Sequence, residues 1–216
     1  FSGKLDKNWR IGVMDMQTAE VDEEFLPRQN FAVISLQRRV FARSNVGFIF
    51  INKQSMDYQP PDNPDAPVYT QYNRNLGLEY NLASSNNLWT GKAVVLKSFT
   101  PDVSGKDFTH AANLQYFNRR LTVSWQHEYV GENYNAEVGY IPRKNFIRIY
   151  PTAGYLFFPK GNRVLSHGPK LSSSYYFDPS FNQTDNLSIL SYAVTFRKQS
   201  VLTGWTNHEY VKLLQP

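Results

Sequence analysis

The stretch Asn75-Leu76-Gly77-Leu78-Glu79-Tyr80-Asn81-Leu82-Ala83 decides the fold class, because its polar and apolar residues alternate one by one. Alternation with a period of two sorts side chains onto two faces only when the backbone is extended, so the stretch predicts a β-strand. One face is apolar and the other carries Glu79. The apolar face holds Leu76, Leu78, Tyr80 and Leu82.

The segment Leu121 to Tyr129 repeats this pattern further along the chain. Its apolar positions include Leu121, Val123 and Trp125, and Tyr129 follows at the end. The opposite face holds Ser124, Gln126 and Glu128. Two strands of this kind predict a sheet with one apolar and one polar surface, and we expect the apolar surface to contact lipid.

Weaker alternation recurs over most of the chain, and no segment predicts a helix. The fold class expected is therefore all-β, an antiparallel up-and-down meander that forms an outer-membrane β-barrel or part of one. Most of the strands run about 9 to 12 residues, close to the length that crosses a bilayer. The expected strands are Trp9–Thr18, Phe31–Phe41, Val46–Lys53, Arg74–Ala83, Leu88–Phe99, Thr109–Asn118, Leu121–Val130, Asn135–Ile141, Phe146–Phe158, Ser166–Phe177, Leu187–Arg197 and Val201–Tyr210.

The connections alternate between short turns and long polar loops, as in an outer-membrane barrel. The tight turns expected at one rim are Ala42–Asn45, Ser84–Asn87, Arg119–Arg120 and Pro142–Asn145. The long loops expected at the other rim are Ala19–Asn30, Gln54–Asn73 and Thr100–Phe108. The segment Asp178–Asn186 breaks the alternation, because it is long where a turn is due.

The composition excludes several classes of protein. Basic residues exceed acidic ones by only five and are scattered, so nucleic acid is not an expected partner. The chain has no cysteine, which removes disulfides and thiolate chemistry. No run of about 18 apolar residues occurs, so no transmembrane helix is expected.

The first fifty residues contain a set of strand and turn motifs, namely Ser2-Gly3-Lys4, Trp9-Arg10-Ile11-Gly12-Val13, Gln17-Thr18, Asn30-Phe31-Ala32-Val33, Arg38-Arg39-Val40-Phe41 and Ser44-Asn45-Val46-Gly47-Phe48. These motifs resemble a Bacteroidota outer-membrane β-barrel domain of unknown function, which usually follows a module similar to family 9 carbohydrate-binding modules. The match is best over Gly3–Lys53. The upstream module is absent from this chain, and the end Val211–Pro216 lacks the aromatic residue common in outer-membrane barrels.

The resemblance implies an outer-membrane location and either glycan handling or a subunit role in an export or uptake assembly. It implies no catalytic residue. Residues 1–216 are expected to form a single barrel domain or a fragment of a larger barrel. The expected partners are outer-membrane lipid and either glycan or other envelope proteins.

Paired carboxylates are the strongest enzymatic alternative, because glycosidases place two acids about 5 to 10 Å apart across a sugar. Glu128 and Glu137 would face one another if Leu121–Val130 and Asn135–Ile141 formed a hairpin. A soluble β-sandwich that binds or hydrolyses polysaccharide is therefore the rival hypothesis. Its sugar-stacking rings would be Trp125, Tyr129 and Tyr134.

We expect a non-catalytic role in transport, assembly or surface glycan binding. The four histidines are far apart and form no metal-binding motif, so neither a metal nor a cofactor is expected. The acidic loop with Glu20, Asp22, Glu23 and Glu24 lacks the spacing of a calcium loop and is expected to be solvated.

Overall fold

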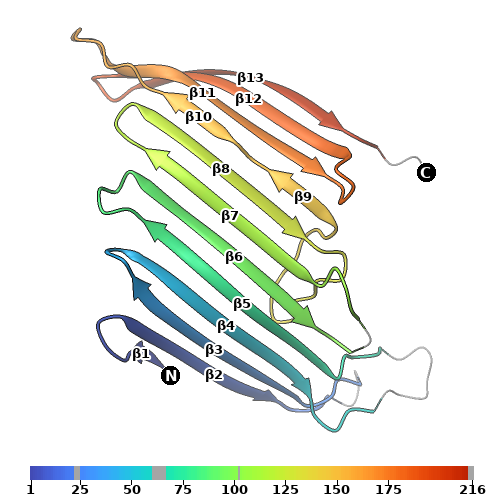
Figure 1. Cartoon of the computed structure of the whole chain (residues 1–216). Coiled ribbons are helices and arrows are strands. Elements are labelled where there is room, and N and C mark those ends of the chain that lie inside the picture. The colour runs from blue at the N-terminus through green and yellow to red at the C-terminus, as the bar shows by residue number, and fades with distance from the viewer. Residues whose placement is uncertain (22–24, 60–66, 102, 214–216) are drawn as a thin grey trace. The chain divides into compact units, whose positions relative to one another are not determined.

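The computed structural model describes residues 1–21, 25–59, 67–101 and 103–213, and every regular element in these ranges is a β-strand. The strands form one sheet in the order β1 to β8 and β10 to β13, while β9 pairs with both β8 and β11 (Figure 1). All the pairs with a defined register are antiparallel. The predicted all-β antiparallel meander is confirmed.

The strand bounds are β1 (Ser2–Lys4), β2 (Trp9–Thr18), β3 (Gln29–Val40), β4 (Ser44–Ser55), β5 (Tyr72–Ala83), β6 (Trp89–Phe99), β7 (Phe108–Phe117), β8 (Leu121–Val130), β9 (Phe146–Ile149), β10 (Thr152–Tyr155), β11 (Val164–Phe177), β12 (Gln183–Phe196) and β13 (Val201–Val211). No helix of the described residues is long and apolar enough to cross a membrane.

The chain divides into two compact units. Unit 1 comprises Phe1–Asn81, Val94–His110 and Val130–Lys144, and unit 2 comprises Leu82–Ala93, Ala111–Tyr129 and Asn145–Pro216. The expected loop residues Asp22, Glu23 and Glu24, and most of the proline-rich stretch of the Gln54–Asn73 loop, lie outside the described residues.

Two expected strands are corrected by the structure. Asn135–Ile141 is not a strand, because the N–H groups of Asn135 and Glu137 bond to side chains of unit 1 and that of Gly139 bonds to the carbonyl of Ala136. Phe146–Phe158 is divided into β9 and β10 at Pro151, which has no N–H to donate to a ladder. The strand β1 was not expected, since three residues are too short to show a period.

The missing strand also corrects two connections. Pro142–Asn145 is no tight turn but the end of one long connection, residues 131–145, between β8 and β9. Within unit 2, the connections 84–88, 118–120, 156–163 and 197–200 join strand ends at one edge, so 178–182 lies at the other edge. The segment Asp178–Asn186 breaks the expected alternation because the sequence pattern predicts one strand too many before it.

In unit 1 the registers of β2, β3, β4 and β5 align apolar residues in rows on one surface, which we call the apolar face. One row is Ile11, Leu36, Phe48 and Leu78, and the next is Val13, Ile34, Phe50 and Leu76. The opposite surface, which we call the second face, is mixed. Its rows include Arg10, Gln37, Gly47 and Glu79, then Gly12, Ser35, Ile49 and Gly77, then Met14, Val33, Ile51 and Asn75, then Met16, Phe31, Lys53 and Asn73.

Unit 2 shows the same division into two faces. A row of its apolar face contains Val123, Ala153, Leu171 and Leu190. The adjoining row on its second face contains Ser124, Thr152 and Ser172. The alternation predicted for Leu76 to Leu82 and for Leu121 to Glu128 therefore sorts side chains as expected, whereas contact of the apolar faces with lipid stays a prediction.

Side-chain burial is the reverse of that in a soluble sheet. Among the described residues, the buried apolar side chains are Pro27, Val130, Tyr134 and Phe146. The largest side chains that are fully buried are instead Asn73, Asn75 and Ser98. Leu78, on the apolar face, is 51% exposed. The interior contacts of this protein are thus mainly polar, and its regular apolar surface is uncovered.

Candidate functional site on the second face

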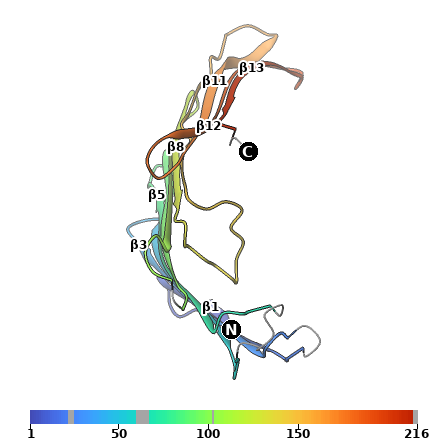
Figure 2. The same cartoon turned by 90° about the vertical axis from the view of Figure 1, so that its right-hand side faces the viewer.

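The best-defined polar site of the molecule lies in unit 1, where the Gly131–Lys144 segment folds over the second face. Figure 2 shows this segment standing on one side of the sheet after β8. It contacts β4, β5 and β6 through side chains that point away from the apolar face. Strand alternation explains which side chains are available, because Lys53, Asn73 and Asn75 occupy second-face positions.

Glu137 is held at the centre of the site by three side chains. Lys53 Nζ donates to Glu137 Oε2 at 2.5 Å, and the Thr70 hydroxyl donates to Oε1 at 2.8 Å. The Asn135 amide also donates to Oε1, at 3.2 Å. The side chains of Lys53 and Glu137 are only 9% and 20% exposed, so this ion pair is largely withdrawn from water.

An amide network continues from the ion pair across the sheet. Asn73 and Asn75 both donate to the carbonyl oxygen of Asn135, at 3.1 and 3.2 Å. The backbone N–H of Asn135 donates to Ser98 Oγ at 3.0 Å, and the N–H of Glu137 donates to Asn73 Oδ1 at 3.3 Å. Asn75 Oδ1 is buried and accepts no hydrogen bond. The network binds the segment to two strands and leaves one amide oxygen unused.

The start of the segment is anchored differently, by backbone contacts. Gly131 N–H donates to the carbonyl of Phe108, and Asn133 N–H donates to that of Lys106, both at 3.0 Å. A Cβ at Gly131 would lie 2.1 Å from the Lys106 carbonyl oxygen, so only glycine permits this approach. The next residue buried in the segment is Tyr134, and burial raises the pKa of its phenol.

Three other ion pairs of unit 1 involve loop residues. Lys97 Nζ donates to the buried carboxylate of Asp107 at 2.6 Å, and this hydrogen bond lowers the pKa of Asp107. Lys106 pairs with Glu132 at 2.9 Å, and Arg28 pairs with Asp57 at 2.8 Å. The last two pairs are exposed, so each contributes little to stability.

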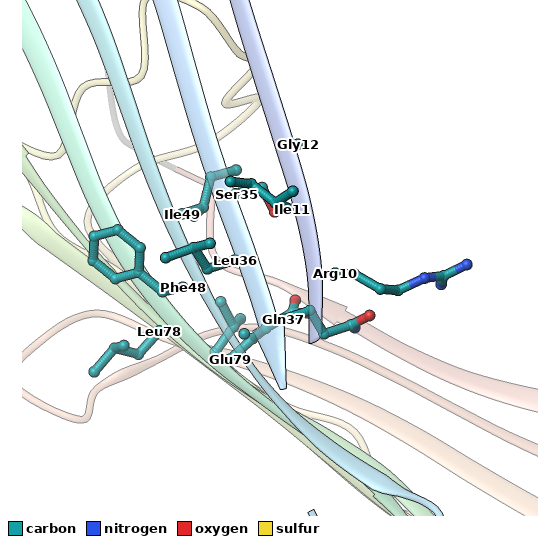
Figure 3. A pocket seen from close by; sticks show the side chains of 12 residues that line it. Arg10, Ile11, Gly12, Ser35, Leu36, Gln37, Phe48, Ile49, Leu78 and Glu79 are labelled. Atoms are coloured by element: carbon teal, nitrogen blue, oxygen red, sulfur yellow. The ribbon is translucent and has the colours of Figure 1, made fainter. Parts of the chain in front are cut away.

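A hollow of about 300 Å³ opens elsewhere in unit 1. Figure 3 shows side chains that line it, with Arg10, Gln37 and Glu79 coming from three different strands. Gln37 and Asn81 both donate to Asn45 Oδ1 at 2.8 Å, and Asn81 also donates to Glu79 at 2.9 Å. These bonds hold polar groups beside Gly47, whose missing side chain leaves room for Glu79.

Unit 2 has its own hollow of about 250 Å³ on the second face. Its lining is rich in hydroxyl and amide groups, and Lys170 is its charged member. The polar lining residues are Thr90, Asn113, Gln115, Thr122, Ser124, Gln126, Tyr150, Thr152 and Lys170. Such a surface can solvate a polar solute, because donors and acceptors are available along several strands.

Aromatic rings gather on the apolar face of unit 2 at the edge with the short turns. Tyr155 and Phe157 have centroids 4.9 Å apart, and Phe157 lies 5.3 Å from the ring of His167. His167 lies 5.9 Å from Tyr192 on the next strand. A second pair at this edge, Trp89 and Tyr116, has centroids 5.0 Å apart.

The structure places the residues of the rival enzymatic hypothesis in different surroundings. Glu128 is on the second face of β8 in unit 2, whereas Glu137 lies in unit 1 and is bound by Lys53. The hairpin that would have joined the two carboxylates is absent, since 135–141 forms no strand. Catalysis by this pair keeps no geometric support.

The three rings suggested for ligand stacking also differ. Trp125 is 47% exposed on the apolar face, and Tyr129, two residues on, has the same strand orientation. Tyr134 is buried, so its ring faces are occupied by protein. A ligand-binding role for these three residues stays a prediction.

Across the described residues, no three His, Cys, Asp or Glu side chains gather to hold a metal ion. The sequence reasoning missed Lys53, Asn73, Asn75 and Ser98, the residues that bind the segment. Alternation places the first three on the second face, but no local pattern shows that a segment more than sixty residues away covers them.

Comparison with known proteins gives no guide, because no protein-family model, no curated protein and no solved structure matches the chain.

Proposed function

We propose that this chain is the membrane-embedded sheet of an outer-membrane β-barrel protein with a non-catalytic transport role. In this proposal the apolar faces contact lipid and the second faces line an aqueous lumen. The observation that carries the proposal is the reversed burial, in which Asn73, Asn75 and Ser98 are enclosed while rows of Leu, Ile, Val and Phe are uncovered. Lipid is the solvent in which this arrangement is stable.

Strand length and row position agree with this proposal. The strands β2 to β8 have 10 to 12 residues, enough for a tilted strand to cross a bilayer, which takes about 9 to 11 residues. In unit 1 the two apolar rows are bordered toward the long loops by a row with Asp15, Asn52 and Arg74. Such a polar border is expected where an apolar band meets the headgroups.

The aromatic edge supports the same placement. Tyr and Trp rings favour the membrane interface, because one end of each is apolar and the other can bond to water. Tyr155, Tyr192, Trp89 and Tyr116 lie on the apolar face beside the short turns of unit 2. In unit 1, the guanidinium of Arg38 lies over the ring of Trp9, in the row next to that of Ile11 and Leu36.

Transport is favoured over catalysis by the second faces. The hollow of unit 2 is lined mainly by hydroxyl and amide groups, and that of unit 1 combines Arg10, Gln37 and Glu79 with apolar side chains. The rival soluble sandwich requires a second sheet over the apolar face, yet the thirteen described strands form a single sheet. The resemblance over Gly3–Lys53 points to the same outer-membrane location.

Adjacent residues on β3 give a direct test of the proposal. Because the chain has no cysteine, Ile34→Cys and Ser35→Cys each supply one thiol for the fluorophore NBD. We expect doxyl-labelled phospholipids in reconstituted vesicles to quench NBD at position 34, on the apolar face, and to spare NBD at position 35.

The two labelled proteins control for one another, since they share strand, depth and chemistry. A chain that stays dissolved in buffer without detergent, with neither position quenched, would exclude membrane placement. Equal quenching at both positions would exclude an aqueous second face.

A further inference from the structure

The Gly131–Lys144 segment is the strongest candidate for a function beyond the sheet itself. It is not a surface loop, because it turns back over second-face residues of β4, β5 and β6 and buries them. Lys53 and Asn73 are both buried, although both are polar groups that water would otherwise solvate.

Hydrogen bonds and one ion pair hold residues 135–137 of the segment, whereas Tyr134 before them is buried. Amides, a hydroxyl and one ion pair bind Asn135 and Glu137. Water can replace such contacts if the segment lifts, whereas a well-packed apolar core would resist separation. The unused acceptor Asn75 Oδ1 further lowers the stability of the closed arrangement.

The two parts of the segment differ in attachment. Gly131 and Asn133 are tied by backbone hydrogen bonds to Phe108 and Lys106, which makes a fixed base. Residues 135–137 are held through side chains, and Lys53–Glu137 is the only ion pair there among the described residues. Loss of this pair would leave the outer part with hydrogen bonds alone, while the base stays attached.

We propose that the Gly131–Lys144 segment is a strap that narrows the aqueous passage, and that Lys53–Glu137 is the latch that keeps it closed. This inference rests on the proposed function, because a strap over the second face obstructs a passage only if that face lines a lumen. The latch is suited to the task, since a buried pair loses its stabilisation when either charge is removed.

Charge reversal tests the latch in the protein reconstituted into planar bilayers in KCl. We expect Lys53→Glu and Glu137→Lys each to raise the mean conductance about tenfold or more, as a released strap shifts the population toward the open state. The double variant Lys53→Glu/Glu137→Lys restores an ion pair and should return the conductance toward that of the unaltered protein.

The exposed pair Arg28–Asp57 supplies the matched control, because it lies in the same unit but not on the second face under the strap. Arg28→Glu should leave the conductance unchanged. A rise in Arg28→Glu equal to that in Lys53→Glu would show that the effect is unspecific and would overturn the latch.

A disulfide tests the strap independently of the charge reversals, and it also covers failure of Lys53→Glu to fold. In the cysteine-free chain, Ser98→Cys/Asn135→Cys joins two residues already in contact. We expect its oxidised form to conduct no more than the unaltered protein, even with Glu137→Gln added, and reduction to raise the conductance of that triple variant.

The outcomes separate the two proposals. If the Ile34 and Ser35 labels show insertion but the conductance is the same for every latch variant and for both redox states, the strap is wrong and the membrane placement stands. If neither label shows insertion, the proposed function fails first.

Discussion

Gly131 lies against the backbone of Lys106 and Phe108, so a larger residue at this position should destabilise the protein. In Gly131→Ala, the new Cβ would lie 2.1 Å from the Lys106 carbonyl oxygen and 2.8 Å from that of Phe108. Backbone atoms cannot move aside as a flexible side chain can, so we expect a loss of about 1 to 3 kcal/mol in the free energy of unfolding.

Guanidinium unfolding of the reconstituted protein measures this loss. Gly161→Ala is the control, because no atom lies within 4 Å of a Cβ at that position. Equal midpoints for the two alanine variants would show that the segment does not pack against Lys106 as described.

The carboxyl group of Asp107, directly before β7, should make the stability of the protein depend on pH. The hydrogen bond from Lys97 lowers the pKa of this carboxyl in the folded protein, against the opposing effect of burial. A lowered pKa contributes stability above the unfolded-state value of about 3.9, and the contribution disappears as pH falls through the folded-state value. We therefore expect the stability difference between the unaltered protein and Asp107→Asn to be largest near neutral pH and to shrink below about pH 4.

Carboxyl NMR titration of Asp107 separates the two causes. In Lys97→Met the pKa should rise, because the largest lowering contact is lost and burial still favours the protonated form. An unchanged pKa in that variant would mean that Lys97 does not control the carboxyl.

At the scale of the element, the sequence predicts strands where pattern and pairing agree. The bounds of β2 and β8 follow from alternation alone, since each strand sorts its side chains onto two faces without help from distant residues. Alternation also assigns Leu76 and Leu78 to one face and Glu79 to the other. Local patterns suffice for these elements because the face is a property of the strand itself.

The segment 135–141 shows where that reasoning fails. Alternating polar and apolar residues imitate a strand there, but the backbone donors of Asn135 and Glu137 are taken by Ser98 and Asn73. These partners lie 37 and 64 residues away in the sequence. A period of two records which side chains share a face and carries no information about which distant groups satisfy the backbone.

One such error affects the elements that follow it. An extra strand reverses the expected direction of every later one, so the connection at 178–182 was assigned to the edge with the short turns. The candidate site was affected in the same way, because the proposed approach of Glu128 to Glu137 depended on that strand. Lys53, Asn73 and Asn75 are recognised as site residues only from their three-dimensional contacts with Asn135 and Glu137.

At the scale of the whole molecule, the apolar surface of each unit determines whether the protein is stable in water or in a bilayer. Rows such as Ile11, Leu36, Phe48 and Leu78 extend over four strands and are not covered by a second sheet of the described residues. Continuous apolar surface of this kind is rare on a soluble monomer. A bilayer satisfies it, and the polar groups on the second face then need water.

Arginine substitutions on the two faces test this requirement by energy. Leu78 belongs to the middle of three successive rows on the apolar face. The row on one side of it contains Trp9 and Tyr80, and the row on the other side contains Val13 and Leu76. Leu78→Arg therefore places a charge within the apolar band. We expect Leu78→Arg to reduce the free energy of unfolding in lipid vesicles by about 2 to 4 kcal/mol, which is the cost of arginine near the bilayer midplane. Gln37→Arg, in the adjoining row of the second face, keeps a donor for Asn45 and should cost little. Urea titration in vesicles measures both, and because the two positions share a unit and a depth, similar costs for both would mean that the two faces do not meet different solvents.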